Sequence, residues 1–304
     1  MKLEGIHHIT AITADGQKNV DFYVGVMGLR LVKKTVNQDD PTVYHLFFAD
    51  EKGSAGADLT FFEYPGAPKG RAGEGMIHTI VSRVGSEESL DFWEKRLGGE
   101  GIETAQADGR LRFEDPEGLG HELKVDDSGD DALTAEHPEI PSEHALRGFD
   151  AARAHSSRSD ASRELFEEAL GFQPQDEGWE VRGDSRGGVY FLDEPPPERG
   201  LQAAGTVHHI AWASQISDHE AWRDRVIKAG AQPTPVIDRF YFKSIYFREP
   251  SGVLFEIATL GPGFTVDEPL ESLGEKLSLP PDFEHLRDKV EPNLRPITNP
   301  RVPA

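Results

Sequence analysis

The chain has 304 residues, and its 54 acidic and 32 basic side chains give a formal net charge of −22. Nucleic acid and anionic membranes are not expected as partners, because such an acidic surface would repel both; the same surface would keep the protein dispersed at high salt. The absence of cysteine excludes disulfides, thiolate-bound zinc, iron–sulfur clusters and a cysteine nucleophile.

The N-terminal segment MKLEGIHHITAI contains no long apolar run and no cleavage signature. A run of ~18 apolar residues, which a transmembrane helix needs, occurs nowhere in the chain. We therefore expect a cytoplasmic protein, large enough for two domains of ordinary size.

The first quarter of the chain predicts one strand, one helix and three further strands. An alternating strand at 5–13 leads into a helix that Asp15 can cap and that stops at Gly28. The three strands that follow are predicted at 29–35, 42–48 and 57–62. The same order of elements recurs three more times.

The second unit begins with a strand at 75–84. Its helix has Ser86 as the predicted cap and an apolar stripe that ends at Leu97. The unit closes with the segment LRFEDPEGLGHELKV at 111–125.

The third and fourth units lie beyond an acidic stretch of the chain that predicts a linker. In the third unit, a helix is predicted between Asp160 and Gly171. In the fourth, Ser217 and Glu220 form a capping-box pattern at the start of a helix that Gly230 ends. The segment IYFREPSGVLFEIA closes this last unit.

Four such units predict an α+β fold of four βαβββ modules in two tandem domains. The first domain is expected at 1–125 and the second at 146–260, with the linker at 126–145. The remaining segment, 261–304, is acidic and rich in proline, with a helix predicted around 282–290. We expect this extension to pack on the body of the protein.

Overlaying the modules shows that two of them carry a histidine at an equivalent position. The opening strands align as GIHHIT, MIHTIV, GFDAAR and VHHIAW. At the second position of the HH pair the four modules have His8, Thr79, Ala151 and His209. Only modules one and four therefore place an imidazole there.

The closing strands add a carboxylate. EDPEGLGHELKV in module two matches REPSGVLFEIAT in module four, so Glu122 and Glu256 are equivalent. A carboxylate among apolar neighbours is costly to bury unless a cation or hydrogen-bond donors compensate it. If modules one and four face each other, His8, His209 and Glu256 can meet. The set from modules two and three cannot hold a metal. We interpret Glu122 as a relic of the repeat or a hydrogen-bonded core residue rather than a ligand.

Strict alternation along a strand places His8 on the face of Ile6 and Thr10, and His209 on the face of Val207 and Ala211. The first histidine of each pair then points to the opposite face, where a purely structural role is open. Two imidazoles and one carboxylate suit a divalent first-row metal and leave positions free, as in the facial triad of non-heme iron(II) oxygenases. Zinc and manganese fit the same ligand set.

The modules resemble those of the vicinal oxygen chelate superfamily, which includes extradiol dioxygenases, glyoxalase I and the fosfomycin- and bleomycin-resistance proteins. More narrowly, the chain resembles hydroquinone-type ring-cleaving dioxygenases of that superfamily. The segments that carry this resemblance are GIHHITAIT, FYVGVMGLRLVKKTVNQDDPTVYHLFFADEKGSAG, GTVHHIAWA, FREPSGVLFEIAT and GPGFTVDEPLESLGEKLSLPP. They extend over nearly the whole chain, including the C-terminal segment that shorter relatives lack.

The resemblance implies an iron(II) enzyme, with manganese(II) also compatible, that opens a hydroquinone- or catechol-type aromatic diol with O2. It also implies roles for particular residues, namely the metal ligands His8, His209 and Glu256, the substrate-binding residues His7 and Thr10, and the catalytic residues His208, Arg239 and Tyr246. Arg239 and Tyr246 could equally be a surface arginine and a core aromatic residue. His45 and His78 receive no function, and a homo-oligomer is the default expectation.

Two alternatives remain open. One is a metal-dependent lyase, isomerase or transferase of the glyoxalase or fosfomycin-resistance kind, which needs no O2. Glyoxalase-type sites usually have a fourth protein ligand, and Thr60 occupies the first module's equivalent of Glu256, which counts against this alternative. The other is a metal-free protein that binds an aromatic compound, as resistance proteins of the superfamily do.

Overall fold

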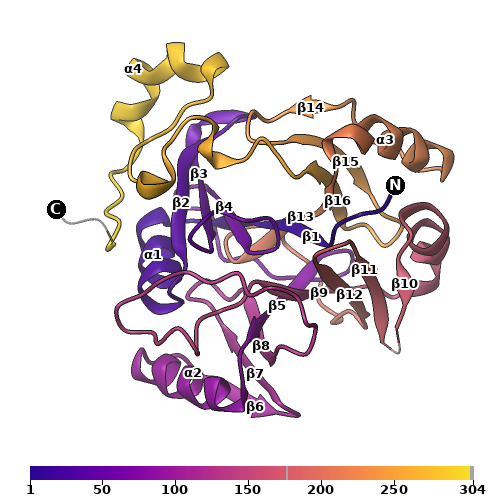
Figure 1. The fold of residues 1–304 in the computed structure, drawn as a ribbon, viewed down its shortest axis with the longest axis horizontal. Helices are drawn as coiled ribbons and strands as arrows, with labels where there is room; N and C mark the ends of the chain where they lie inside the picture. Colours follow the sequence, from indigo (N-terminus) through magenta and orange to yellow (C-terminus); the bar gives the residue numbers. More distant parts are fainter. Residues whose placement is uncertain (176, 302–304) are drawn as a thin grey trace.

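The computed structural model describes residues 1–175 and 177–301, so residue 176 and residues 302–304 of the expected domain ranges lie outside the described part. The described chain forms two eight-stranded sheets (Figure 1). In spatial order, the first sheet contains β14 (Ile237–Asp238), β15 (Lys243–Arg248), β16 (Leu254–Thr259), β13 (Thr206–Ser214), β1 (Ile6–Thr13), β4 (Asp58–Glu63), β3 (Asp40–Ala49) and β2 (Arg30–Asn37). The second contains β10 (Gln173–Pro174), β11 (Gly178–Arg182), β12 (Gly187–Asp193), β9 (Phe149–His155), β5 (Ile77–Val84), β8 (Gly120–Val125), β7 (Arg110–Glu114) and β6 (Thr104–Ala107).

The predicted α+β fold of four βαβββ modules is confirmed by this strand order. Each sheet takes one module from either half of the chain. The first sheet joins modules one and four through the antiparallel pair β1–β13, and the second joins modules two and three through β5–β9. Modules one and four therefore lie side by side, which is the condition under which His8, His209 and Glu256 can meet. Residues 126–145 contain no helix and no strand of either sheet, and the domain boundaries there stay predictions.

The helices begin largely where the sequence places their caps. The side chain of Asp15 accepts a hydrogen bond at the start of α1 (Gly16–Val20), and Ser86 does the same for α2 (Glu87–Gly99). The helix of module one continues as a π-helical turn at 21–26, and that of module three consists of a 3-10 turn at 159–162 and a π-helical turn at 165–170. Among the described helices, none combines the length and hydropathy needed to span a bilayer.

The capping box predicted for module four is wrong. The helix α3 (His219–Lys228) starts after Asp218, and no side chain caps it. A 3-10 turn at 216–218 precedes the helix, and the Ser217 hydroxyl donates to the Asp218 carboxylate, while no side chain accepts from a backbone N–H of the first turn.

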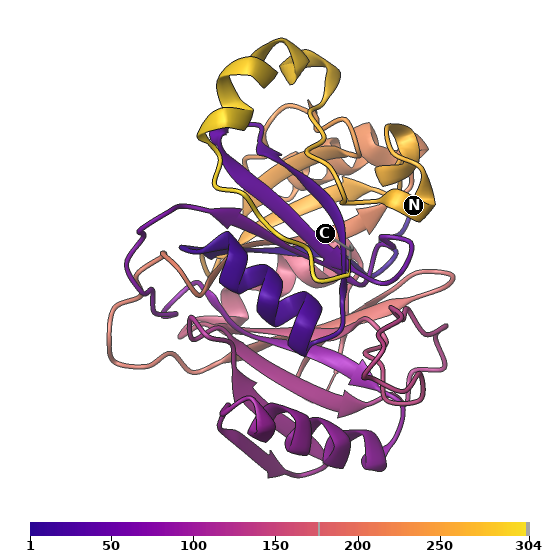
Figure 2. The same ribbon diagram turned by 90° about the vertical axis from the view of Figure 1, so that its left-hand side faces the viewer.

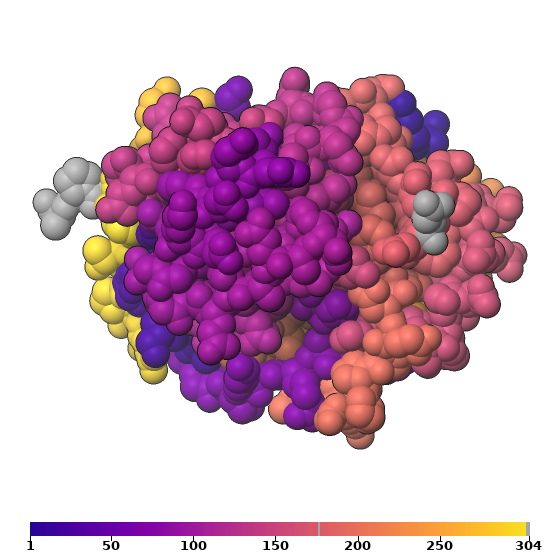
Figure 3. All heavy atoms as spheres, turned by 90° about the horizontal axis from the view of Figure 1, so that it is seen from below, coloured from indigo at the N-terminus to yellow at the C-terminus, as the bar shows by residue number. Residues whose placement is uncertain are grey.

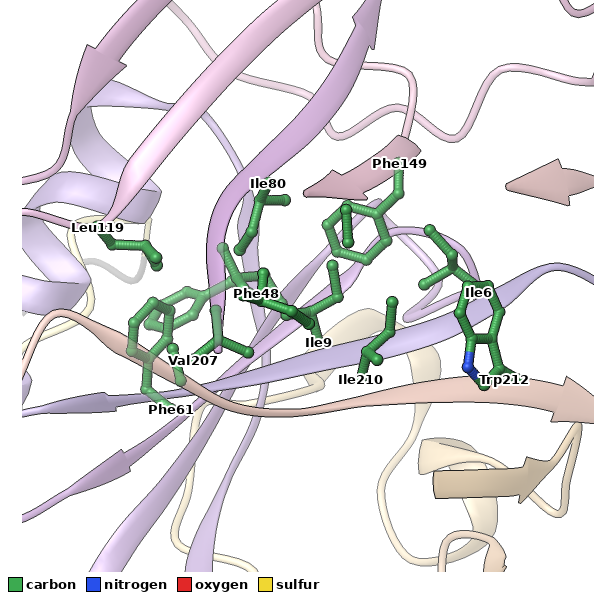
Figure 4. Packing of buried hydrophobic residues seen from close by; sticks show 14 of the residues in the cluster. Ile6, Ile9, Phe48, Phe61, Ile80, Leu119, Phe149, Val207, Ile210 and Trp212 are labelled. Carbon is green, nitrogen blue, oxygen red and sulfur yellow. The ribbon is translucent and has the colours of Figure 1, made fainter. Parts of the chain in front are cut away.

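The main hydrophobic core lies between the two sheets, which are stacked in Figure 2. Figure 4 shows the contact, in which side chains of the first sheet meet side chains of modules two and three. The residues labelled there are Ile6, Ile9, Phe48, Phe61, Val207, Ile210 and Trp212 from modules one and four, and Ile80, Leu119 and Phe149 from modules two and three. Seen from below, modules two and three cover that side of the molecule (Figure 3).

The opposite face of the first sheet carries a second, smaller apolar cluster that includes Phe47, Phe242 and Phe264. Phe264 belongs to the C-terminal extension, which packs beside β2 and β3, as expected (Figures 1 and 2). The extension has 3-10 turns at 264–266, 270–272, 281–286 and 291–293 and the short helix α4 (Arg287–Val290). The 3-10 turn at 281–286 and α4 together confirm the helical segment predicted around 282–290.

A buried lysine attaches the extension to the sheet. Lys33, on β2, is fully buried, and its ammonium group donates to Asp267 at 2.7 Å and to the Glu268 carboxylate. The hydroxyl of Tyr241 donates to the other oxygen of Asp267 at 3.0 Å. Because a buried ammonium group is stable only when its donors are satisfied, these contacts fix the extension against the face of the sheet that bears the second cluster.

Candidate metal centre

Two β-bulges define the place where modules one and four meet. Between Ile6 and His8, β1 advances two residues while β13 advances one. Between His209 and Val207, β13 advances two residues while β1 advances one. The extra residue is the first histidine of each HH pair. A bulge bends the strand and redirects its side chains, and such bulges are common beside functional sites.

The bulges overturn the prediction from strict alternation. Ile6 and Val207 pack into the core between the sheets, so His8 does not share a face with Ile6, nor His209 with Val207. The two extra histidines also stay near the site, because His7 contacts Phe242 and His208 contacts Phe62, with ring centroids 5.2 and 5.5 Å apart.

The structure brings His8, His209 and Glu256 together. The Nε2 atoms of the two histidines are 3.3 Å apart, and they lie 3.2 Å and 2.9 Å from Oε2 of Glu256. All three side chains are buried. Three ligand atoms about 2.1 Å from a common metal ion would be spaced roughly 3 Å from one another, so this donor set fits a divalent metal.

The carboxylate of Glu256 is prepared for a cation. Oε1 accepts a hydrogen bond from the hydroxyl of Ser244, whereas Oε2 is buried and has no hydrogen-bond donor of acceptable geometry among the described residues. Burial alone would raise the pKa of Glu256, but His8 and His209 outweigh it and hold this pKa well below its usual value. An ionised oxygen without a donor, inside the protein, calls for a positive charge beside it.

His7 determines which nitrogen of His8 is free. Nε2 of His7 lies 3.1 Å from the carbonyl oxygen of Thr259, which can only accept, so we assign the His7 proton to Nε2. Nδ1 of His7 then accepts from Nδ1 of His8, 2.9 Å away, and the lone pair of His8 is left on Nε2. Burial and the neighbouring His8 lower the pKa of His7 to about 3, so this ring is neutral.

His208 contacts His209 in the corresponding way. Their Nδ1 atoms are 2.8 Å apart, so His209 can also direct Nε2 toward Glu256. Burial and then the charge of His209 lower the pKa of His208 to about 3. Burial also lowers the pKa of His209 itself, which favours the neutral ring that a metal ligand requires.

A pocket opens beside the candidate ligands, and His8 and His209 form part of its lining. Aromatic rings form much of its wall, and the remaining lining is polar. The residues that line it are His8, Thr35, Asn37, Gln38, Asp39, His45, Phe47, Phe62, His209, Arg239, Tyr241, Phe242 and Tyr246. Four of the residues to which the sequence assigned a role in the site, His7, Thr10, His208 and Glu256, are not part of this lining.

Arg239 and Tyr246 stand together at the pocket. The guanidinium group of Arg239 donates to both oxygens of Asp39, at 3.0 and 2.9 Å, and its Nε donates to the Tyr246 hydroxyl at 3.3 Å. Gln38 donates to the backbone carbonyl of Arg239 at 2.8 Å. At the rim of the pocket, the β2–β3 turn of module one therefore contacts the segment before β15 of module four.

His45 is the pocket residue that sequence reasoning missed. Its ring lies against Phe47 and Phe62, with centroids 4.0 and 4.4 Å apart, and its Nε2 is 2.9 Å from the Thr60 hydroxyl. Thr60 in turn donates to Thr10 at 2.8 Å. The signal would have been the strand pairing, because β3 and β4 bring His45 beside the strand that carries Thr10.

Among the described residues, the second sheet has no corresponding cluster of possible metal ligands. Glu122, the counterpart of Glu256, is buried and forms ion pairs with Arg110 and with Arg112, the latter at 2.7 Å. This arrangement agrees with the interpretation of Glu122 as a hydrogen-bonded core residue. Two arginines supply here the positive charge that Glu256 lacks.

Comparisons with known proteins agree with this geometry. The model of the Glyoxalase/Bleomycin resistance protein/Dioxygenase superfamily matches residues 5–123 and 148–257. MhqO of Bacillus subtilis, named as a ring-cleaving dioxygenase, is 42% identical over 305 residues, which cover 97% of each chain. The chlorohydroquinone/hydroquinone 1,2-dioxygenase of Sphingobium indicum is 33% identical over 320 residues, covering 99% of this chain and 98% of that protein.

Solved structures extend the comparison to three dimensions. A crystal structure described as a dioxygenase from Bacillus subtilis has a TM-score of 0.91 and 40% identity, and the match covers 99% of both chains. Glyoxalase I from Zea mays is similar in fold, with a TM-score of 0.55 and 15% identity over 84% of this chain and 92% of that chain.

Proposed function

The chain belongs to the Glyoxalase/Bleomycin resistance protein/Dioxygenase superfamily, and from that premise we propose that it is a ring-cleaving dioxygenase. The substrate would be a hydroquinone- or catechol-type aromatic diol, and both atoms of O2 would enter the product. One O2 is then consumed for each ring opened, and no external reductant is needed. The observation that carries the proposal is the cluster of His8, His209 and Glu256 at the wall of an aromatic-lined pocket.

His8, His209 and Glu256 would hold iron(II), with manganese(II) as the alternative, since three protein ligands leave room for other ligands. When bound, such an ion supplies a Lewis acid that favours the ionised substrate hydroxyl and a redox centre for O2. His7 and His208 orient the two ligand imidazoles through their Nδ1 atoms.

Tyr246 and Arg239 would act as donors to negative charge that develops during the reaction. Burial, with the nearby Glu256 charge, raises the pKa of Tyr246, so its phenol keeps its proton and can donate it. Asp39 raises the pKa of Arg239 against the effect of burial, so the guanidinium group stays charged. The rings of Phe47, Phe62 and Phe242 would pack on the substrate and exclude water.

The lyase alternative needs a fourth protein ligand at the position of Thr60. The Thr60 hydroxyl instead bonds with His45 and donates to Thr10, so it supports the pocket lining from behind. This observation favours the dioxygenase.

O2 uptake tests the proposal. Protein reconstituted with iron(II) under anaerobic conditions would be offered hydroquinones and catechols, while absorbance reports a ring-opened product. We expect one O2 per diol. Tight metal binding without uptake on any diol would favour the lyase. Ligand binding that survives replacement of each of His8, His209 and Glu256 by alanine would favour the metal-free binding protein.

A further inference from the structure

Two neighbouring polar side chains in the pocket wall have unused hydrogen-bonding capacity. Thr35 on β2 and His45 on β3 are paired residues of the first sheet, and both line the pocket. Thr35 is 1% exposed, and its Oγ1 is close to the Tyr241 hydroxyl but makes no hydrogen bond of acceptable geometry with any described residue. A buried hydroxyl without a partner is uncommon and points to a missing ligand or water.

The free nitrogen of His45 is an acceptor. The single proton of the Thr60 hydroxyl is donated to Thr10, so the bond between Thr60 and His45 requires the proton on Nε2 of His45. Burial, followed by the charges of His8 and His209, lowers the pKa of His45 well below its usual value, so the ring is neutral. Its Nδ1 therefore carries a lone pair, and no described residue donates to it.

The other polar groups at this side of the pocket already have partners. Arg239 is held by Asp39, and Gln38 donates to the carbonyl of Arg239. The Tyr241 hydroxyl donates to Asp267. Thr35 and His45 are thus two adjacent groups of the described wall, one able to donate to a ligand and the other able to accept from it.

The two side chains lie two or more strands from His8 and are also offset along the strands, because His45 pairs through Phe62 with Ile12. His45 lies on β3, and β4 alone separates β3 from β1, which carries His8. Neighbouring strands are about 4.8 Å apart, so two spacings amount to roughly 10 Å before side chains fill part of the gap. Phe47 and Phe62 lie on either side of His45 in this space.

We propose that Thr35 and His45 bind the second hydroxyl of the substrate, at the side of the ring away from the metal ligands. A hydroxyl accepts one hydrogen bond and donates another, which matches the Thr35 hydroxyl and His45 Nδ1. A hydroquinone, with its hydroxyls on opposite sides of the ring, meets both ends of the pocket. A catechol has adjacent hydroxyls and leaves this pair unsatisfied. The inference rests on the proposed function and deepens it by selecting para-diols.

Binding to a redox-inert form tests the inference without turnover. Protein loaded with zinc(II) would be titrated with hydroquinone, phenol and catechol under anaerobic conditions by calorimetry. We expect wild type to bind hydroquinone at least about tenfold more tightly than phenol, which lacks the second hydroxyl, and more tightly than catechol. His45→Leu and Thr35→Val should reduce the ratio of hydroquinone to phenol affinity toward one.

His45→Asn is the matched control, because its amide oxygen can accept near the position of Nδ1 and should retain part of the ratio. If His45→Leu does not fold, Thr35→Val decides alone, since it keeps the shape of the side chain. An unchanged ratio of hydroquinone to phenol affinity in the folded variants would overturn the inference. The proposed function would still stand if the wild-type iron(II) enzyme consumed O2 with a diol. Absence of both uptake and diol binding in wild type would overturn both.

Discussion

His8 and His209 lie on adjacent antiparallel strands from opposite ends of the chain, with their Nε2 atoms 3.3 Å apart. Oε2 of Glu256 completes the triangle at 3.2 and 2.9 Å. Two ring nitrogens and a carboxylate oxygen converge there, and the oxygen has no donor of suitable geometry among the described residues.

Glu256→Gln should abolish metal binding, because the amide replaces the ionised oxygen. The expected loss exceeds the roughly 100-fold that removal of an outer supporting residue causes. Glu122→Gln is the matched control, since it changes the equivalent residue of the second sheet, where Arg110 and Arg112 replace the metal. Metal content per chain after dialysis measures both, and equal metal loss in the two variants would disprove the assignment.

His7→Phe should weaken metal binding about 10- to 100-fold, because the proton on Nδ1 of His8 loses its acceptor. His208→Phe should have a smaller effect, since the other ring nitrogen of His208 contacts no described residue comparable to the Thr259 carbonyl. Metal titration of the purified variants measures the two affinities. A raised KM with unchanged metal affinity in His7→Phe would instead indicate that His7 contacts substrate.

Asp39→Asn should reduce kcat/KM by roughly tenfold while changing the free energy of unfolding by less than about 1 kcal/mol. Asp39 is largely exposed, and exposed ion pairs contribute little to stability. The pair does orient Arg239 toward Tyr246, and misplaced donors are costly in catalysis. Asp40→Asn, which alters only a contact with Thr42, is the control. Equal activity in the two variants would show that the ion pair is dispensable.

Lys33→Met should destabilise the protein by about 3 kcal/mol, because Asp267 and Glu268 lose a buried partner. Lys34→Met, at the next position, should cost less than about 1 kcal/mol, since Lys34 is only partly buried and donates to a single carbonyl. Urea unfolding followed by tryptophan fluorescence gives both values. Similar costs in the two variants would mean that the extension contributes little to stability.

Stability should fall on acidification partly because of His121. Burial lowers the pKa of this histidine to about 3, and its ring contacts the Tyr23 hydroxyl. Between pH ~6.5 and about 3 the unfolded chain binds a proton that the folded protein excludes, so the stabilisation is present above pH ~6.5 and is lost as pH falls.

His121→Gln should therefore lose less stability than wild type on acidification, by up to about 1.4 kcal/mol for each pH unit below ~6.5. Urea unfolding of both metal-free proteins at pH 7.5 and pH 5.5 provides the comparison. Parallel losses in the two proteins would show that His121 takes up its proton while folded.

The sequence was sufficient for the module pattern and for bringing His8, His209 and Glu256 together, because a repeat exposes the positions at which its copies differ. The faces of the strands were not predictable, since a one-residue bulge at each HH pair changes every side chain that follows. His45 was missed for a related reason. Its place in the pocket depends on three strand pairings, and nothing near it in sequence marks a site.

The union of the first and last modules in one sheet affects how the protein is made. His8 and His209 are 201 residues apart, which at ~5–20 residues per second requires roughly ten seconds or more of synthesis. Throughout that interval β1 emerges without its partner β13, and an unpaired strand edge of this kind favours aggregation. Binding of a metal by the proposed centre would have to wait for the last module, so metal occupancy would mark chains whose synthesis had reached the fourth module.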